Sequence, residues 1–314
     1  MNRRDLLKGL SIISGSACFG VALARAAQSP LDRFKLGAIS DGFSQDFAEA
    51  LKILKGYGLP WVEIRNVWGV YNTEATPAQI QRIKDLLNKY QCRVSVVDTA
   101  LYKCVLPGTK AVGGEKDLYP YAGQMDLLQR AIERARALGT DKLRIFTFWR
   151  TSEPTRVFDR ISEELAKAAQ IAHASGMRLL IENESACNVA TGREVAQILK
   201  MTPASNLGAN WDVGNGWWQG EVSFPDGYAA LDKRRLWHLH VKGVRCEKGI
   251  TNCQETTAGQ GANDLLGQFH ALVRDGYEGT MSLECEVESP GMTHLATTKR
   301  SLEELLQILS KTTG

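Results

Sequence analysis

Motifs that would reveal a function at once are scarce in this sequence of 314 residues. No Cys-x-x-Cys pair occurs, which argues against a zinc ribbon and against a thioredoxin-like redox site. The first apolar segment ends in Ser40-Asp41-Gly42-Phe43 rather than in a glycine-rich turn, which disfavours a nucleotide-binding open sheet. No low-complexity linker interrupts the chain after residue 30, so we expect residues 27–314 to form a single domain.

An excess of charge of either sign is also missing beyond the N-terminus. The formal net charge is +3, but the first 26 residues hold Arg3, Arg4, Lys8 and Arg25 against only Asp5, so 34 basic and 34 acidic side chains remain after them. Neither nucleic acid nor a membrane is therefore an expected partner of the mature chain. Hydrophobic residues at 44% and charged residues at 23% are typical of an ordinary globular protein.

The N-terminal segment has the pattern of an export signal. Arg3-Arg4 is followed by an apolar, small-residue-rich run over 10–23 and by an Ala-x-Ala cleavage site at 24–26. The run is shorter than the roughly 18–20 residues that a membrane span needs. The arginine pair resembles the twin-arginine (Tat) motif. We therefore predict that residues 1–26 are a twin-arginine signal peptide, with an uncleaved amphipathic helix as the alternative.

This prediction has consequences for the mature protein. Its partner during export would be the Tat machinery, and its location would be the periplasm. In an oxidising compartment Cys246 and Cys253 could close the short loop between them, although free buried thiols are an equally good interpretation.

From residue 34 onwards, short apolar runs alternate eight times with amphipathic stretches. The expected strands are 34–40, 61–65, 93–99, 142–149, 178–184, 206–215, 236–244 and 280–287. The expected helices are 47–58, 77–90, 125–139, 157–175, 193–200, a weaker one at 226–235, 263–276 and 301–311. Near-continuous apolar strands are typical of a parallel sheet buried on both faces. The pattern predicts an α/β fold, a (β/α)8 TIM barrel, with a doubly wound open sheet as the alternative.

Polar residues gather at the ends of several expected strands, where a barrel carries its functional side chains. They are Glu63 and Arg65, Glu182 and Glu184, Asp212 and Asn215, His238, His240 and Lys242, and Glu284 and Glu286. Carboxylates are rarely buried unless they are paired or bind a metal. Acidic groups ending three strands around a histidine suit one divalent metal ion, with Mn²⁺, Mg²⁺ or Co²⁺ favoured and Zn²⁺ also compatible.

The local sequences at these ends resemble a known family. They are Leu180-Ile181-Glu182-Asn183, Trp211-Asp212-Val213-Gly214-Asn215, Leu239-His240-Val241-Lys242 and Ser282-Leu283-Glu284. In this order they are similar to the metal-binding strands of the sugar phosphate isomerase/epimerase superfamily, whose barrel is xylose isomerase-like and which includes ketose 3-epimerases. The resemblance covers about residues 34–310. One departure is Gln260, where the family usually has an acidic residue.

The resemblance implies a ligand set and a mechanism. The metal ligands would be Glu182, Asp212, His240 and Glu284. Glu182 and Glu284 would also be catalytic, exchanging a proton at a sugar carbon beside a carbonyl, while the metal stabilises the resulting enediolate. Three of the ligands have an alternative role: Glu182 could pair with an arginine such as Arg144, Asp212 could cap a helix, and His240 could be a hydrogen-bonded core residue. His238 is expected to support the site.

Further residues are candidates for substrate contacts. Glu63 could bind a sugar hydroxyl or form a salt bridge with Arg65, and Lys242 could polarise a carbonyl or pair with a ligand carboxylate. Asn215 follows the sixth strand. Tryptophan rings stack on sugars, so those just beyond strand ends are candidates, although each could instead cover the core. They are Trp68, Trp149, Trp217 and Trp218.

These inferences favour a metal-dependent isomerase or epimerase that acts on an unphosphorylated sugar or keto-sugar, because no glycine-rich phosphate cradle is present. A lyase that cleaves 3-keto-glycosides by β-elimination is the close alternative, and a non-catalytic carbohydrate-binding barrel is another. The related AP-endonuclease barrel is disfavoured, because it needs a histidine-rich site and the chain has only five histidines. The oligomeric state stays open, with a homo-oligomer among the alternatives.

Overall fold

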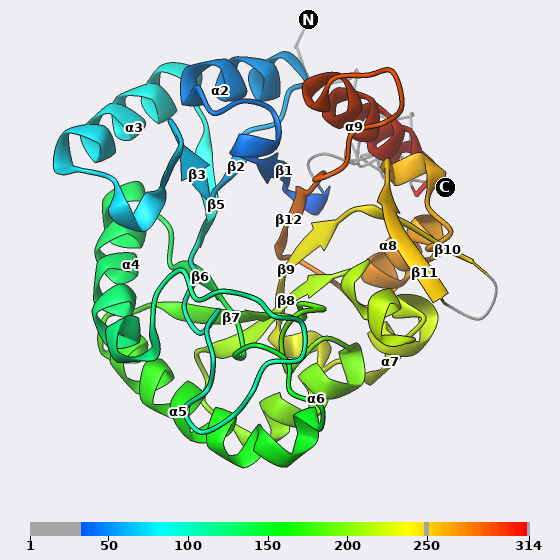
Figure 1. Ribbon diagram of the computed structural model, residues 1–314. Helices are drawn as coiled ribbons and strands as arrows, with labels where there is room; N and C mark the ends of the chain where they lie inside the picture. Colours follow the sequence, from blue (N-terminus) through cyan, green and yellow to red (C-terminus); the bar gives the residue numbers. More distant parts are fainter. Residues whose placement is uncertain (1–32, 248–250, 313–314) are drawn as a thin grey trace, which may run out of the picture.

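The computed structural model describes residues 33–247 and 251–312, so the predicted signal peptide lies outside the described residues. Eight parallel strands form a closed barrel, and hydrogen-bonded neighbours follow the order β1-β12-β9-β8-β7-β6-β5-β2 (Figure 1). The strands are β1 Leu36–Ile39, β2 Trp61–Ile64, β5 Arg93–Asp98, β6 Lys142–Ile145, β7 Arg178–Glu182, β8 Leu207–Asp212, β9 Leu236–Val241 and β12 Thr280–Leu283. The predicted (β/α)8 barrel is confirmed, and the open sheet is wrong.

Helices surround the barrel as an outer ring (Figure 1). They are α2 Phe47–Gly56, α3 Pro77–Tyr90, α4 Gln124–Leu138, α5 Phe158–Ala174, α6 Gly192–Met201, α7 Tyr228–Ala230, α8 Leu265–Arg274 and α9 His294–Ser310. Local sequence explains their bounds. In α3, Thr76 and Gln79 form a capping box and Pro77 occupies the first turn. Within the described ranges, no helix is both long and apolar enough to cross a membrane.

Two helices differ from the prediction. The one expected at 226–235 is reduced to the three residues of α7, because the Asp232 side chain accepts a hydrogen bond from the Arg234 amide at 3.1 Å and starts a separate turn. The last helix begins earlier than residue 301, because the Thr293 side chain caps it by accepting a hydrogen bond from the Ala296 amide.

Insertions after three strands shape the C-terminal mouth of the barrel. A small hairpin, β3 Asn66–Val67 with β4 Val70–Tyr71, follows β2, and a longer one, β10 Gly243–Glu247 with β11 Thr251–Thr256, follows β9. The long segment 99–123 between β5 and α4 crosses over the mouth (Figure 1). A disulfide joins Cys246 to Cys253 within the second hairpin, so the disulfide alternative holds for this pair. The other described cysteines are free and buried.

Candidate metal centre and active site

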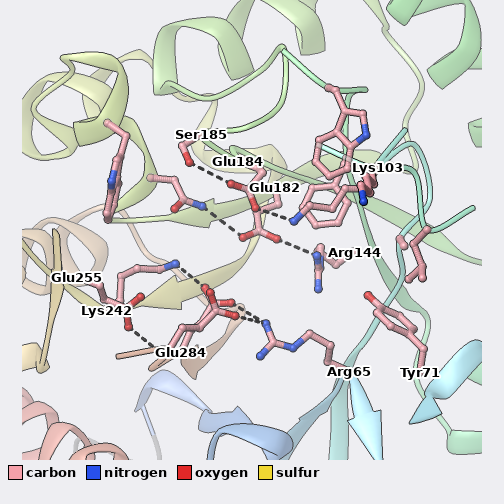
Figure 2. A pocket seen from close by; sticks show the side chains of 18 residues that line it. Arg65, Tyr71, Lys103, Arg144, Glu182, Glu184, Ser185, Lys242, Glu255 and Glu284 are labelled. Carbon is pink, nitrogen blue, oxygen red and sulfur yellow. Dashed lines mark hydrogen bonds and ion pairs between the residues drawn. The ribbon is translucent and has the colours of Figure 1, made fainter. Parts of the chain in front are cut away.

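A pocket of about 330 Å³ opens at the C-terminal mouth, and the strand ends and the insertions supply its walls (Figure 2). Most of the side chains that line it are charged. The charged lining residues are Arg65, Lys103, Lys116, Arg144, Glu182, Glu184, Lys242, Glu255, Glu284 and Glu286. Apolar contact comes from Tyr71, Phe146, Trp149 and Trp218.

The four predicted metal ligands converge beside this pocket, and Glu182 and Glu284 belong to its lining. One ligand-type atom from each of Glu182, Asp212, His240 and Glu284 lies within 4.8 Å of the others, and all four residues are buried. Nδ1 of His240 is 3.2 Å from Glu182 Oε1, 3.3 Å from Glu284 Oε2 and 4.0 Å from Asp212 Oδ2. One imidazole nitrogen thus faces three carboxylates. We call these four residues the metal cluster.

The other nitrogen of His240 is held from below by Glu63. Glu63 Oε1 lies 2.9 Å from Nε2 of His240, and its Oε2 lies 2.8 Å from Nε2 of His238. Because a carboxylate only accepts hydrogen bonds, Glu63 favours a proton on Nε2 of His240, which also lies 3.0 Å from the Asn210 amide nitrogen, while Nδ1 faces the metal cluster. His238 is fixed further by Thr280 Oγ1, 2.7 Å from its Nδ1.

Glu63 does not reach the pocket surface. Its side chain is completely buried and is not part of the pocket lining, so the structure adds no support for its predicted contact with a substrate hydroxyl. It is not paired with Arg65 either. Each carboxylate oxygen of Glu63 contacts one of the two histidines, which accounts for its buried position. Burial alone would raise the pKa of Glu63, but the two histidines hold it well below its usual range.

Burial and the charges of neighbouring groups shift the pKa values of the metal cluster. Burial raises the pKa of Asp212 to about 7, and the charges of Glu284 and Glu182 add to this effect although Lys242 opposes it. Burial alone would lower the pKa of His240, but Glu63, Glu182 and Glu284 hold it well above its usual range. The cluster thus retains protons that a group in water would release.

Basic side chains hold the outer oxygens of the two glutamates (Figure 2). Arg144 lies 3.3 Å from Glu182 Oε2, and Arg65 lies 3.3 Å from Glu284 Oε1. Lys242 sits between Asp212 and Glu284, at 3.0 and 2.8 Å from their carboxylate oxygens. Lys242 thus lines the pocket but is paired, the second of the two roles expected for it.

The donor set fits a divalent metal ion. Three carboxylates and one imidazole are buried around one point, and Glu63 orients the imidazole from outside. Asp212 Oδ2 and Glu284 Oε2 accept no hydrogen bond of suitable angle in the described part of the chain, although both lie close to Lys242. Buried carboxylate oxygens without a well-formed hydrogen bond are available to bind a metal ion.

The tryptophans divide into two groups. Trp149 lines the pocket, with its indole nitrogen donating to Asp117 Oδ1 at 2.8 Å, and Trp218 lines it as well. Trp68 and Trp217 do not. Trp68, in the turn between β3 and β4, packs edge-on against Phe47, and Trp217 is buried outside the pocket lining. The structure therefore does not bring these two rings to the pocket, and their stacking on a sugar stays a prediction.

Asn215 lies where the sequence placed it, in the pocket wall. Its amide nitrogen is 3.5 Å from Glu182 Oε1, and its backbone N–H donates to Asp212 Oδ1 at 2.8 Å. A second backbone N–H, that of Gly214, donates to the same oxygen at 2.7 Å. Asp212 therefore caps the turn that follows β8, which is the alternative role considered for it, while its other oxygen lies 4.0 Å from Nδ1 of His240.

Several pocket residues were not among the predicted site residues. Lys103 comes from the segment 99–123 and pairs with Glu184 at 2.9 Å. Glu255 comes from β11, and its Oε1 accepts a hydrogen bond from the Glu286 amide at 2.7 Å. Both lie on insertions rather than on barrel strands, so no strand-end pattern could have indicated them.

Comparisons with known proteins agree with this architecture. A protein named inosose dehydratase from Clostridium botulinum (strain Alaska E43 / Type E3) is 25% identical over 141 residues, which span 40% of this chain and 46% of that protein. The chain thus matches less than half the length of this relative. The structure of IOLI protein with a binding zinc atom has a TM-score of 0.69 at 16% identity, covering 88% of this chain and 98% of that one.

A second solved structure, 3-keto-D-glucoside 4-epimerase YcjR from E. coli, has a TM-score of 0.64 at 14% identity and covers 88% of this chain and 98% of that one. The family described as xylose isomerase-like TIM barrel matches residues 46–311. The match spans the barrel from α2 to α9 and includes all four residues of the metal cluster. The chain therefore belongs to the xylose isomerase-like TIM barrel family.

Proposed function

We propose that this protein is a divalent-metal-dependent sugar isomerase or epimerase that moves a proton at the carbon beside a carbonyl group. One observation carries the proposal: Glu182 and Glu284, from separate strands, both reach Nδ1 of His240 while lining the same pocket. Two carboxylates beside one bound sugar can remove a proton and return one. The solved epimerase with the same barrel adds support.

The metal cluster would hold the ion, with Mn²⁺, Mg²⁺ or Co²⁺ as the favoured candidates. Such an ion supplies a Lewis acid that polarises the sugar carbonyl. Glu182 takes the proton from the neighbouring carbon, and Glu284 supplies one from the other side, or the reverse. Arg144 and Arg65 fix the outer oxygens of these carboxylates, so that each base keeps one orientation during proton transfer.

The charge distribution of the pocket supports a neutral substrate. Arg65, Lys103, Arg144 and Lys242 each lie within 3.3 Å of a carboxylate oxygen, and only the exposed Lys116 lacks such a partner among the described lining residues. No buried cation is left for a phosphate group. The rings of Phe146, Trp149 and Trp218 provide apolar faces for sugar C–H groups. An unphosphorylated sugar or keto-sugar therefore fits best.

Hydrogen exchange tests this function directly. The metal-loaded protein is incubated in D₂O with a panel of neutral aldoses, ketoses and 3-keto-glycosides. Deuterium should enter one substrate at the carbon beside its carbonyl, and an isomer should accumulate. If no sugar in the panel gains deuterium in the presence of bound Mn²⁺, Mg²⁺ or Co²⁺, the proposed chemistry is contradicted.

A lyase is the second candidate, and Glu255 is the observation that favours it. Its carboxyl group lines the pocket from β11, and burial raises its pKa to about 7 although Lys242 opposes this. A protonated carboxyl group can donate to a leaving oxygen once the proton beside the carbonyl has been removed. The relative named inosose dehydratase also points to elimination. Release of an aglycone or water without an isomeric sugar would favour this candidate, and Glu255→Gln should then slow release more than exchange.

We also propose that residues 1–26 direct export through the twin-arginine route, so that the enzyme acts in the periplasm. The motif Arg3-Arg4, the short apolar run and the Ala-x-Ala site support this proposal. A periplasmic location agrees with a neutral substrate, and the paired cysteines of the second hairpin suit an oxidising compartment.

A further inference from the structure

A second cavity lies at the opposite, N-terminal mouth of the barrel. Its volume is about 450 Å³, and its residues stand just before the strands or at their first positions. Lys35 precedes β1, Trp61 begins β2, Lys142 begins β6 and Arg178 begins β7. We call this cavity the basal pocket, defined by Lys35, Trp61, Lys142, Arg178, Lys233 and Trp237. None of these residues lines the catalytic pocket.

Cations in the basal pocket have few acidic partners. Lys35 Nζ donates to the Glu278 backbone carbonyl at 2.7 Å, and Lys233 Nζ donates to the backbone carbonyl of Leu231 at 2.8 Å and to that of Tyr228. Lys142 has its nearest carboxylate oxygen, from Asp141, at 3.9 Å. Among the described residues, these three lysines therefore have no carboxylate within hydrogen-bonding distance.

Other charges around the basal pocket are balanced. Arg178 pairs with Asp141 at 2.6 Å, and Arg234 pairs with Asp232 at 3.0 Å. Glu278 is the one acidic residue among the described lining residues. Since Asp141 is committed to Arg178, it offers little to Lys142. The result is an excess of positive charge that is concentrated on the lysines.

The catalytic pocket provides an internal comparison. There, Arg65, Lys103, Arg144 and Lys242 all have carboxylate partners at 3.3 Å or less. Lys142, with only 15% of its side chain exposed, has only the more distant oxygen of Asp141, at 3.9 Å. A cation that is largely removed from water and not paired is unfavourable unless an anion is supplied from outside. In agreement, burial and the nearby charges of Arg178 and Lys35 lower the pKa of Lys142, although Asp141 opposes this.

Aromatic side chains in the basal pocket indicate that its ligand contains a ring. Trp61 and Trp237 line the basal pocket and are half-buried, with Tyr277 beside them. The Arg178 guanidinium group lies 5.3 Å from the centroid of the Trp237 ring, so the aromatic wall and the cations adjoin. An inorganic anion would not need indole faces, whereas a ring that carries one anionic group would use both features.

We propose that the basal pocket binds a small anionic sugar, with its acidic group beside Lys35 and Lys142 and its ring against Trp61 or Trp237. A sugar acid and a sugar phosphate share this chemistry. This site is separate from the catalytic pocket, which is at the other end of the barrel and suits a neutral sugar. The proposal does not depend on the proposed catalytic function.

Isothermal titration calorimetry of the whole protein at low salt tests the site. The probes are glucuronate, glucose 6-phosphate, inorganic phosphate and neutral glucose. One or both anionic sugars should bind, more tightly than inorganic phosphate, and affinity should fall as NaCl is added. Their relative affinity distinguishes the carboxylate source from the phosphoryl source. Failure of both anionic sugars to bind at millimolar concentration, or equal binding of neutral glucose, overturns the proposal.

Matched variants locate the binding. Lys142→Met should weaken binding of the anionic sugar at least tenfold, whereas Lys142→Arg, which keeps the charge, should bind within a few-fold of the parent and shows that the position tolerates change. Lys84→Met, on the exposed face of α3, removes the same charge elsewhere and should have no effect. Lys116→Met tests whether the anionic sugar binds in the catalytic pocket instead, because Lys116 lines that pocket. Loss of binding in Lys116→Met, with Lys142→Met unchanged, overturns the proposal.

Discussion

Glu182 and Glu284 approach the same atom, Nδ1 of His240, at 3.2 and 3.3 Å, although β8 and β9 separate their strands in the barrel. Each glutamate turns one oxygen inward to the metal cluster and the other outward to an arginine. If a sugar binds in the pocket as proposed, this shared arrangement gives both carboxylates access to it. It is the geometric basis for assigning proton transfer to both of them.

The first prediction concerns these two bases. Glu182→Gln and Glu284→Gln each keep an oxygen for the metal but remove the group that accepts a proton. Each variant should lose on the order of 10²–10⁴-fold in turnover, the usual contribution of general acid–base catalysis. Deuterium incorporation and turnover are measured with bound metal quantified in every sample.

The pattern of losses separates the candidate reactions. If one variant keeps full turnover with metal bound, two-base proton exchange is excluded and elimination through a single base is favoured. If both variants remain active with metal bound, neither glutamate acts as a base.

Much of this architecture was predictable from the sequence, because its signals are local. Strand and helix positions follow from apolar periodicity, and parallel strands of a barrel must bring their C-terminal ends to one mouth. That rule predicts a cluster of acidic residues around a histidine, and the resemblance to the family selected Glu182, Asp212, His240 and Glu284 among the strand-end residues. The structure adds the distances and the shared nitrogen.

Three predicted substrate contacts do not line the pocket, because long-range packing determines where these side chains lie. Glu63 follows the same alternation as a pocket residue, but it lies one layer deeper because two histidines of β9 hold it there. The positions of Trp68 and Trp217 depend on loop conformation, which the periodicity of the strands does not predict. Trp68 has a φ of 53°, a left-handed backbone conformation that is uncommon for residues other than glycine.

The export proposal predicts the behaviour of a variant with Arg3→Lys and Arg4→Lys. Twin-arginine recognition depends on the arginine pair, so the precursor should stay in the cytoplasm while its positive charge is unchanged. Cell fractionation and the mass of the N-terminal peptide measure this. Cleavage after Ala26 in the parent protein would support the proposed site, and unchanged periplasmic delivery of the variant would contradict the twin-arginine route.

The protonation of the metal cluster predicts how metal binding depends on pH. Asp212 has its pKa raised to about 7, so below this pH a metal ion must displace its proton. Affinity should therefore rise by about tenfold per pH unit below pH 7 on account of this residue alone. His240, whose pKa is also raised, adds proton release at higher pH. Calorimetry in two buffers of different ionisation enthalpy counts the protons, and an affinity that does not change between pH 5.5 and 8 would contradict the cluster.

The same group has a defined effect on the metal-free fold. Because folded Asp212 keeps its proton up to about pH 7, whereas an unfolded aspartate releases it near about pH 4, its contribution to the free energy of unfolding decreases as pH rises through this window. Bound metal removes this loss. The increase in melting temperature on adding Mn²⁺ should consequently be larger at pH 8 than at pH 6, as measured by differential scanning fluorimetry.

Two tryptophans provide a matched pair for substrate binding. Trp149→Leu removes a ring that lines the pocket and should raise KM for the sugar with little change in metal affinity. Trp68→Leu removes a ring of the same kind that packs against Phe47 and Arg82 outside the pocket, so it should lower the melting temperature and leave KM unchanged. Steady-state kinetics and thermal unfolding measure both, and a KM effect confined to Trp68→Leu would reverse the assignment.

The last prediction concerns Glu63, which orients His240 without touching the pocket. In Glu63→Gln, one carboxylate oxygen becomes an amide N–H₂ that cannot accept a hydrogen bond from a histidine, and the negative charge that strengthens the imidazole as a ligand is lost. Metal affinity should fall by about 10–100-fold, as is usual when a partner of a metal-binding histidine is changed. Thr280→Val is the control, because it removes the partner of His238 Nδ1 and leaves the Glu63–His240 contact in place. Its metal affinity should stay within a few-fold of the parent. Metal titrations of the two folded variants compare them without any need for a substrate. Equal affinities in Glu63→Gln and the parent protein would mean that His240 is held by the rest of the barrel, and that Glu63 only neutralises the buried histidines.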